Sequence, residues 1–466
     1  MSIRLFKFHL KVPILLLAGI EAALFYFAVF FAAALVQGPH AAAEATPGGK
    51  LWLTAVLFAV TAVAGLFAMG LYATRQRSGR TGMALRVVAG ILFAAAACAL
   101  VFYLLPVVKV GPEVLGLAVA VAVASSVIVR LLFERVLDQD IFKRRVLVFG
   151  AGHRAASLMQ LRRRVDQRGF KLVAFMATEG DTVSAPADRL TLRPKDLYAW
   201  ALEHEIDEVV VAMDDRRQGF PMHELLECRI AGIDVLELPT FLERETGKVR
   251  LDVTSPSWFI FGEGFRVSPL QLVLSRAFDI LSSLALLVVA SPFMVLAVLA
   301  IKLEDGAAAP VLYRQRRVGQ HGEIFDVLKF RSMRVDAERP GQAQWAVTND
   351  PRVTRVGAFI RKTRIDELPQ LFNVLRGDMS FVGPRPERPE FVEQLEQVIP
   401  YYHERHSVKP GITGWAQLCY PYGASEKDAF EKLQYDLYYV KNRSLVFDFA
   451  ILVQTVEVVL WGKGAR

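Results

Sequence analysis

The sequence contains little cysteine, and this scarcity excludes two common kinds of stabilising scaffold. Its 466 residues include only Cys98, Cys228 and Cys419, which lie far apart and form no Cys-x-x-Cys motif. Disulfide frameworks and zinc sites built on cysteine need even numbers or close spacing, so we expect neither. Reduced thiols are also typical of a protein body that faces the cytoplasm.

The sequence also lacks any recognisable nucleic-acid-binding motif, although its net charge is +8 and its isoelectric point is about 9.3. Apolar residues are abundant instead. They make up 53% of the chain, give a mean hydropathy of +0.32 and gather in long blocks, which is typical of membrane proteins. The basic residues flank these blocks. We therefore expect the positive charge to face an anionic lipid leaflet, with no nucleic-acid partner.

Four apolar segments in residues 1–135 predict a bundle of four transmembrane helices. Each is close to the roughly 20 residues that cross a bilayer as a helix; they are 12–36, 51–73, 83–105 and 112–133. Arginine and lysine cluster before the first segment, between the second and third, and after the fourth, so both ends of the bundle should be cytoplasmic. Glu21 lies inside the first segment, where a charge is costly. We expect a contact with a neighbouring helix or a protonated carboxyl; a functional group is the alternative.

Residues 140–250 alternate between strand and helix patterns, which predicts a parallel sheet in a Rossmann-like α/β module. Strands are expected at 146–149, 171–176, 208–213 and 233–238, and helices at about 156–168, 196–205 and 222–231. Gly150 and Gly152 follow the first strand, where a dinucleotide pyrophosphate would bind, but Ala155 takes the last glycine position. Such turns need glycine for steric reasons too. A regulatory or dimerising module is the favoured interpretation, with nucleotide binding as the alternative.

The apolar run 284–301 contains Ser291 and Pro292 near its centre. Proline has no amide hydrogen and clashes with the preceding turn, so a helix kinks or breaks there. If this segment crossed the bilayer, everything after it would lie outside the cell, on the opposite side from the preceding α/β module. A re-entrant helix over about 277–302, broken at Ser291 and Pro292, would keep residues 269–466 on the cytoplasmic face. A kinked full span is the alternative.

Two adjacent carboxylates, Asp366 and Glu367, are the main candidates for chemistry. Pro369 follows them, and apolar residues recur at helical spacing up to Gly377, so the pair is predicted at a helix N-terminus. Carboxylates are stabilised there as simple caps. The surrounding basic residues favour catalysis instead, because an ionised aspartate beside arginines and a divalent cation can attack a phosphorus atom.

Basic residues around the pair are candidate phosphate or lipid contacts. Arg385 lies between two prolines that fix its backbone, which suits bidentate phosphate binding; an ion pair with Glu387 is the alternative. Lys329 and Arg331 follow a short strand-like run, and Arg364 ends a stretch whose spacing predicts an amphipathic helix with a basic face. That helix could lie on a membrane or in solvent.

His403 and His406 are three residues apart and could share a helix face. The sequence shows no obvious third ligand beside them, so no metal site is predicted there.

Five blocks, in this order, resemble the bacterial sugar transferase family, which comprises the polyprenyl-phosphate hexose-1-phosphate transferases, also called monotopic phosphoglycosyl transferases. The resemblance covers about 269–464. It rests on Ser291-Pro292, Leu328-Lys329-Phe330-Arg331-Ser332-Met333, Arg364-Ile365-Asp366-Glu367-Leu368-Pro369-Gln370, Gly383-Pro384-Arg385-Pro386 and Lys409-Pro410-Gly411-Ile412-Thr413-Gly414-Trp415-Ala416-Gln417. The four spans and the Rossmann-like module are similar to the long members that initiate exopolysaccharide or O-antigen synthesis.

The resemblance implies a reaction and the residues that perform it. Hexose-1-phosphate would pass from a UDP-hexose to undecaprenyl phosphate, with release of UMP and a covalent sugar-phosphate intermediate on Asp366. Mg²⁺ would bind at Asp366 and Glu367. Arg385 would hold the diphosphate, and Lys329, Arg331 and Arg364 would help to bind the anionic substrates.

The expected architecture is therefore a membrane α-helical bundle, an α/β Rossmann-like module and an α-rich α+β monotopic catalytic domain with a re-entrant helix. The protein should be a multi-pass protein of the bacterial inner membrane, with its catalytic domain on the cytoplasmic face. Its expected partners are the two substrates, the bilayer and downstream glycosyltransferases, and a homodimer is compatible with the sequence. A nucleotide-sugar oxidoreductase or epimerase and a non-catalytic scaffold are the alternatives. No motif identifies the hexose.

Overall fold

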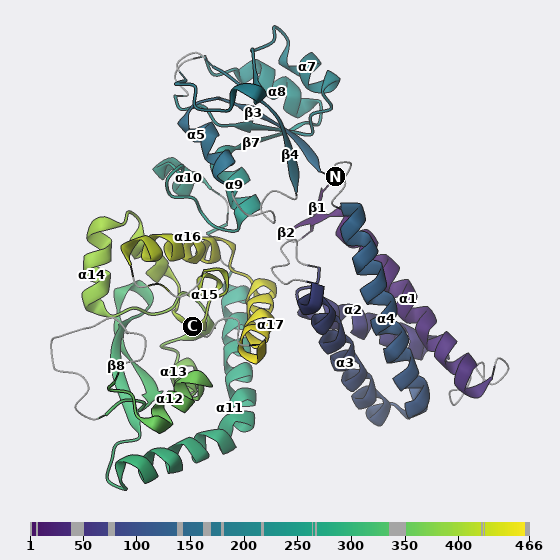
Figure 1. The fold of residues 1–466 in the computed structure, drawn as a ribbon, viewed down its shortest axis with the longest axis vertical. Helices are drawn as coiled ribbons and strands as arrows, with labels where there is room; N and C mark the ends of the chain where they lie inside the picture. Colours follow the sequence, from purple (N-terminus) through teal and green to yellow (C-terminus); the bar gives the residue numbers. More distant parts are fainter. Residues whose placement is uncertain are drawn as a thin grey trace. The chain divides into compact units, whose positions relative to one another are not determined.

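The computed structural model describes residues 2–5, 8–38, 51–72, 80–137, 143–161, 169–178, 181–215, 219–262, 264–265, 268–334, 351–420, 423 and 425–461 (Figure 1). The chain divides into two compact units, Met1–Phe241 and Leu242–Arg466. The expected bounds of the three regions, 1–135, 140–250 and 269–466, stay a prediction.

Four helices form the first part of unit 1, after a short antiparallel pair of strands, β1 (Ser2–Leu5) and β2 (Phe8–Lys11). They are α1 (Val12–Gln37), α2 (Leu51–Ala68), α3 (Arg80–Leu104) and α4 (Pro112–Leu137). Three are apolar and long enough to cross a membrane, whereas the apolar part of α2, Leu51–Phe67, is shorter. The backbones of α2 and α3 approach so closely that a Cβ on Gly65 would lie 2.3 Å from the carbonyl oxygen of Gly90. Small residues permit this kind of packing between membrane helices.

Glu21 is fully buried in α1 and contacts neighbouring helices, as the sequence predicts. Its carboxylate accepts hydrogen bonds from Tyr72, Ser126 and Arg130, at distances of 2.6–2.8 Å. Arg130 on α4 also donates to the carbonyl oxygen of Leu71. The positive charge of Arg130 and the hydroxyl donors compensate the buried negative charge of Glu21. Ionisable groups are tolerated inside a helical bundle when they are paired in this way.

A five-stranded sheet with the order β5-β4-β3-β6-β7 forms the second part of unit 1, and every described pairing in it is parallel. Its strands are β3 (Arg144–Phe149), β4 (Phe170–Met176), β5 (Leu190–Thr191), β6 (Glu208–Val211) and β7 (Asp234–Glu237). The parallel sheet is confirmed, with β5 as an addition to the expected strands. The strand order reverses between β3 and β6, which suits the Rossmann-like interpretation.

The helices of this sheet are short. They are α5 (His153–Ala156), the 3-10 turns η4 (Ser157–Gln160) and η5 (Ala187–Arg189), α7 (Leu197–Glu203) and α8 (Met222–Ile230). The part of the expected helix, about 156–168, that follows Leu161 lies outside the described residues. Helix α9 (Leu238–Thr246) follows the sheet and runs into unit 2.

Unit 2 contains one long apolar helix, α11 (Pro269–Asp305), which has the length and composition of a membrane helix. Figure 1 shows it as two arms that meet at a bend. Pro292 cannot donate to the carbonyl oxygen of Val288, and the hydroxyl of Ser291 donates to that oxygen instead, at 2.9 Å. The helix remains continuous through this pair. Whether it re-enters the membrane stays a prediction.

The rest of unit 2 mixes short strands and helices. An antiparallel hairpin, β8 (Leu312–Val318) and β9 (Ile324–Phe330), encloses the turn η6 (Gln320–Gly322). Strands β10 (Ser380–Val382) and β11 (Gly411–Thr413) pair in parallel. The helices and 3-10 turns are α10 (Pro256–Phe261), α12 (Arg355–Lys362), η7 (Ile365–Glu367), α13 (Gln370–Arg376), α14 (Pro389–Val398), η8 (Tyr402–Ser407), α15 (Trp415–Cys419), α16 (Glu426–Asn442) and α17 (Leu445–Trp461).

Candidate active site

Asp366 and Glu367 lie in η7, a single 3-10 turn that follows α12 and leads into α13. The sequence predicts the pair at the N-terminus of a helix, and the structure places it in this turn, just before α13. Helix α13 begins after Pro369, which occupies the capping position and has no amide hydrogen. Arg364 enters the turn with a φ of 60°, a left-handed conformation that is unfavourable for a residue with a Cβ. The carboxylates therefore stand on a tight, strained connection between two helices.

Asn373 fixes the turn's position relative to the hairpin. This fully buried residue on α13 accepts a hydrogen bond from the amide of Leu328 at 3.0 Å and donates to the carbonyl oxygen of Asp326 at 2.7 Å. Both partners lie on β9, and Leu328 immediately precedes Lys329. The amide side chain thus brings the lysine that follows Leu328 toward the carboxylates.

Glu367 is the anionic centre of a cluster of three cations. Its Oε1 lies 3.1 Å from Nη2 of Arg385, 3.4 Å from Nζ of Lys329 and 3.7 Å from Nη1 of Arg364. Burial alone would raise the pKa of Glu367, but these three positive charges outweigh it and hold the pKa well below its usual range. Glu367 is therefore ionised throughout the physiological range.

Asp366 has the opposite environment. It is 8% exposed, and its Oδ1 has no hydrogen-bond partner within the described part of the chain. Burial, together with the adjacent charge of Glu367, raises the pKa of Asp366 to about 6, and the positive charges of Lys329 and Arg364 only partly oppose this. Two neighbouring carboxylates with pKa values shifted in opposite directions are typical of sites where each has a separate role.

The loop that carries Arg385 packs directly on the loop 409–417. The amide of Gly383 donates to the carbonyl oxygen of Thr413, and the amide of Gly411 donates to that of Pro384, both at 2.9 Å. A Cβ on Gly411 would lie 2.1 Å from the nitrogen of Gly383. Glycine is required at this contact for steric reasons, which explains why each of these two separate sequence blocks has a glycine there.

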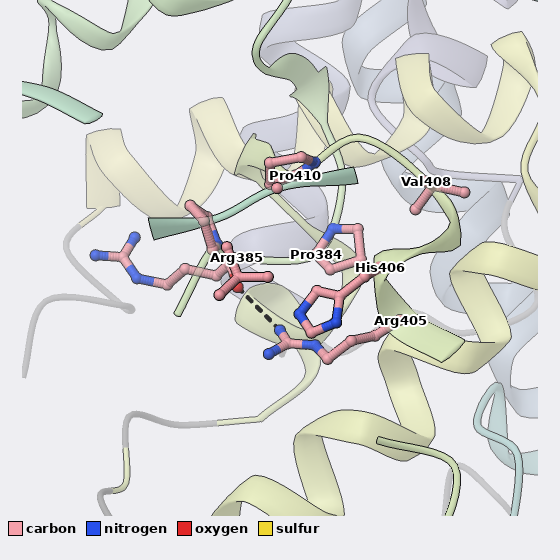
Figure 2. A pocket seen from close by; sticks show the side chains of 9 residues that line it. Pro384, Arg385, Arg405, His406, Val408 and Pro410 are labelled. Carbon is pink, nitrogen blue, oxygen red and sulfur yellow. Dashed lines mark hydrogen bonds between the residues drawn. The ribbon is translucent and has the colours of Figure 1, made fainter. Parts of the chain in front are cut away.

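Arg405 holds the carbonyl group of Arg385, a role that no sequence pattern indicates. Its Nη2 donates to the Arg385 oxygen at 2.9 Å, which Figure 2 shows as a dashed line. The same Nη2 donates to Asp436 at 2.8 Å, and Nη1 donates to the hydroxyl of Tyr402. The side chains of Arg405 and Asp436 are 6% and 3% exposed. Such a buried pair is costly to break, so it fixes the backbone from which the Arg385 side chain extends.

The other basic candidates have different positions. Glu387, the alternative partner considered for Arg385, pairs with Arg317 at 3.4 Å, and burial lowers the pKa of Arg317 to about 10. Arg331 is half-buried, and none of its described contacts reaches Asp366 or Glu367; its amide donates to Val311. The structure therefore brings Lys329, Arg364 and Arg385 together at Glu367, but not Arg331.

The first arm of α11 is attached to this site. Arg276 donates to the carbonyl oxygens of Val374 and Leu375 at the end of α13, at 2.6 and 2.8 Å. Asp279, which is 5% exposed, accepts hydrogen bonds from the amide of Phe381 and the hydroxyl of Ser380 at the start of β10. The apolar helix and the carboxylate turn therefore form one packed body.

A divalent cation suits the donor set at the turn. The free oxygen of Asp366 and the carboxylate of Glu367 are hard donors of the kind that Mg²⁺ prefers. Oε1 of Glu367 already contacts three cations, so the remaining oxygens of the two carboxylates are the donors that a metal could use. Asp366 and Glu367 are thus the residues that would hold the metal.

The glycine turn of the sheet does not suit a dinucleotide. Asp214 accepts hydrogen bonds from the amides of His153 and Arg154, and Asp181 accepts one from the amide of Ala151. A Cβ on Gly152 would lie 2.0 Å from Oδ2 of Asp214. These carboxylates accept the hydrogen bonds of the amide groups that a pyrophosphate would need, and their negative charge would repel the pyrophosphate.

Comparison with known proteins gives the class to which this site belongs. Residues 270–462 match the family model described as "Bacterial sugar transferase". An undecaprenyl-phosphate glucose phosphotransferase of Komagataeibacter xylinus is 32% identical over 77% of this chain and 67% of its own length. An undecaprenyl-phosphate galactose phosphotransferase of Salmonella typhimurium is 32% identical over 72% of each chain. The chain therefore belongs to the bacterial sugar transferase family.

A third relative is more similar over a shorter stretch. The UDP-N-acetylgalactosamine-undecaprenyl-phosphate N-acetylgalactosaminephosphotransferase of Aeromonas hydrophila is 42% identical over 56% of this chain, and the match spans 60% of that relative. The three relatives are named for three different sugars. Family membership therefore does not determine which sugar this chain uses.

Proposed function

We propose that this protein transfers a hexose-1-phosphate from a UDP-hexose to undecaprenyl phosphate and releases UMP. One observation carries the proposal: a buried carboxylate oxygen of Asp366 has no partner and lies beside a carboxylate, Glu367, that gathers three cations. The names of the relatives, all undecaprenyl-phosphate sugar phosphotransferases, support the same substrates.

The first step is attack by Asp366 on the β-phosphorus of the UDP-hexose. A bond forms between the carboxylate oxygen and phosphorus, the bond from phosphorus to the bridging oxygen breaks, and UMP leaves with that electron pair. The sugar–oxygen bond survives. With a pKa of about 6, Asp366 is roughly nine-tenths ionised at pH 7 and is more basic than an ordinary aspartate, which favours it as a nucleophile.

The cations around Glu367 make that attack electrostatically feasible. An aspartate and a diphosphate repel each other, so the approach needs positive charge that is already in place. Arg385 and Lys329 provide it, and Glu367 fixes both without taking part in the bond changes. A bound Mg²⁺ would supply further neutralisation of the diphosphate.

In the second step an oxygen of undecaprenyl phosphate attacks the phosphorus of the aspartyl phosphosugar. A new diphosphate bond forms, and the carboxylate of Asp366 is released. The acceptor is a membrane lipid, and α11 provides the route to it. This helix exposes large apolar side chains along its length, including Leu281, Val288 and Val289, and is attached to the site through Asp279. We place the site on the cytoplasmic face of the inner membrane, with α11 re-entrant.

The reaction is tested with purified protein, undecaprenyl phosphate and a panel of UDP-sugars, with UMP release as the signal. At least one UDP-sugar should give UMP release that depends on Asp366, and that sugar identifies the donor. Binding of NAD(P)H should be absent, because the carboxylates of Asp181 and Asp214 fill the glycine turn of the sheet. A stoichiometric bound dinucleotide without UMP release would favour the oxidoreductase alternative.

A further inference from the structure

Glu396, His403 and His406 come together on the side of unit 2 formed by α14 and η8. Oε1 of Glu396 lies 3.0 Å from Nδ1 of His403 and 4.0 Å from Nδ1 of His406. One donor atom from each of the three residues lies within 4.8 Å of the other two. The third ligand that the sequence lacked beside the two histidines is therefore supplied by a helix that precedes them in the chain.

His406 has a buried ring that is poorly hydrogen-bonded. The residue is 6% exposed, and neither ring nitrogen has a partner in good hydrogen-bonding geometry within the described residues. A buried imidazole normally makes at least one good hydrogen bond, so this ring needs an explanation. The ring lines a cavity of about 10 Å³, together with Pro384 and Arg385. Figure 2 shows the His406 ring between Pro384 and Arg405.

We propose that Glu396, His403 and His406 form a binding site for a divalent transition-metal ion of the zinc class, separate from the carboxylates at the catalytic turn. Two imidazoles and a carboxylate are the donors that zinc prefers, whereas Mg²⁺ prefers oxygen. Three protein ligands with one exposed side are also typical of zinc sites that keep a position for water. The side chain of His403 is 64% exposed, so such a position is open here.

The geometry needs only small movements to close around the ion. Tetrahedral zinc with bonds of about 2.0–2.1 Å places its ligand atoms roughly 3.3 Å apart. His406 is held by its burial, while Glu396 and His403 are exposed enough to move by the difference of up to about 1.5 Å.

The neighbouring positive charge does not prevent binding. Arg405 precedes His406, but its guanidinium pairs with buried Asp436. Arg405 also holds the carbonyl oxygen of Arg385, so an ion that joins α14 to η8 would stabilise the support of the turn that carries Arg385. The site thus has a structural role beside the reaction.

The test measures zinc in the full-length protein, purified with a tag that contains no histidine and stripped with a chelator. Wild-type protein should take up one equivalent of Zn²⁺ and melt at a higher temperature with it, and Co²⁺ should give the visible absorption of a four-coordinate site. His403→Gln and Glu396→Gln should each weaken zinc binding by about 100-fold, since even indirect supports of a metal cost 10–100-fold. Both side chains are exposed, so neither change should prevent folding.

Two control variants identify the site. Glu393→Gln makes the same chemical change one turn away on the exposed face of α14 and should keep the zinc. Asp366→Asn should also keep it, because the catalytic turn is a different site. The proposal is overturned if wild-type protein binds no zinc, if His403→Gln and Glu396→Gln bind it as wild type does, or if Asp366→Asn loses it.

Discussion

Arg385 and Glu367 form a direct ion pair across 18 residues of sequence, with 3.1 Å between Nη2 and Oε1. The pair joins the proline-flanked turn to the carboxylate turn, and Lys329 adds a second cation to the same oxygen. Asp366, the residue before Glu367, takes no part in this pairing and keeps a free oxygen. Two adjacent acids therefore have distinct roles: Glu367 organises positive charge, and Asp366 is left available for chemistry.

Arg385 should act mainly on the donor. Arg385→Ala removes a cation from the cluster, so we expect the KM for the UDP-sugar to rise at least about tenfold, in line with the roughly 1.5–3 kcal/mol of a charge-assisted hydrogen bond. Arg385→Lys should recover only part of this, because lysine keeps the charge but not the planar fork. Steady-state kinetics of UMP release measure both. Lys427→Ala, an exposed charge change on α16, is the control; an unchanged KM in Arg385→Ala would contradict the assignment.

The rate of the first half-reaction should fall in acid. Asp366 attacks only when ionised, and its pKa is raised to about 6, so the rate should drop about tenfold per pH unit below that value. Glu367, whose pKa is lowered, stays ionised over the same range. The measurement is UMP release without acceptor between pH 5 and 8, which avoids titration of the lipid phosphate. A rate that is flat down to pH 5 would argue against Asp366 as the nucleophile.

Asp366→Asn should make the protein inactive and more stable. Because the folded-state pKa of Asp366 lies above the unfolded value, the folded protein binds the extra proton between about pH 4 and 6, and stability falls as the pH rises through that window. Asparagine removes this cost at pH 7, about 1–3 kcal/mol for a shift of this size. Thermal unfolding in detergent should show a higher melting temperature together with at least ~10³-fold slower UMP release.

A matched comparison separates this effect from a general response to lost charge. Asp378→Asn changes an aspartate that follows α13 and lies outside the carboxylate turn, so it should not raise the melting temperature. If Asp366→Asn melted below wild type, the ionised side chain would be contributing to stability, and the raised pKa would be wrong.

The two ends of α11 should lie on the same side of the membrane. The three cysteines of the chain are buried, so single added cysteines report accessibility. Ser257→Cys before the helix and Ala308→Cys after it should both react from the cytoplasmic side. Gly111→Cys, in the loop between α3 and α4, should react from the other side, and the structure has space for its side chain. Opposite reactivity of Ser257→Cys and Ala308→Cys would show a full span.

The sequence predicted what depends on local pattern and missed what depends on distant contacts. Hydrophobic length and alternation predicted the helices of the bundle and the parallel sheet, because these signals lie within each element. The sequence indicated that Lys329, Arg364 and Arg385 lie near Asp366. Their convergence on Glu367 depends on Asn373, which attaches the β8–β9 hairpin to α13. No local signal could give that.

Buried polar partners were the least predictable features. Arg405 appeared in the sequence as one basic residue among many, and its support of Arg385 depends on Asp436 from a helix 31 residues away. Asp181 and Asp214 likewise reach the glycine turn from loops after other strands. The carboxylate pair was predicted at the N-terminus of a helix, because Pro369 was expected in the first helical turn. Pro369 instead immediately precedes α13, and the pair lies in the 3-10 turn before it.

The most direct test is to trap the substrate on the protein. Full-length enzyme is incubated with the UDP-sugar that supports UMP release, in the absence of undecaprenyl phosphate, quenched, and digested for peptide mass spectrometry. The account predicts one hexose-phosphate added to Asp366, none in Asp366→Asn, and loss of the label when undecaprenyl phosphate is supplied. An adduct on any other residue, or active turnover in Asp366→Asn, would contradict it.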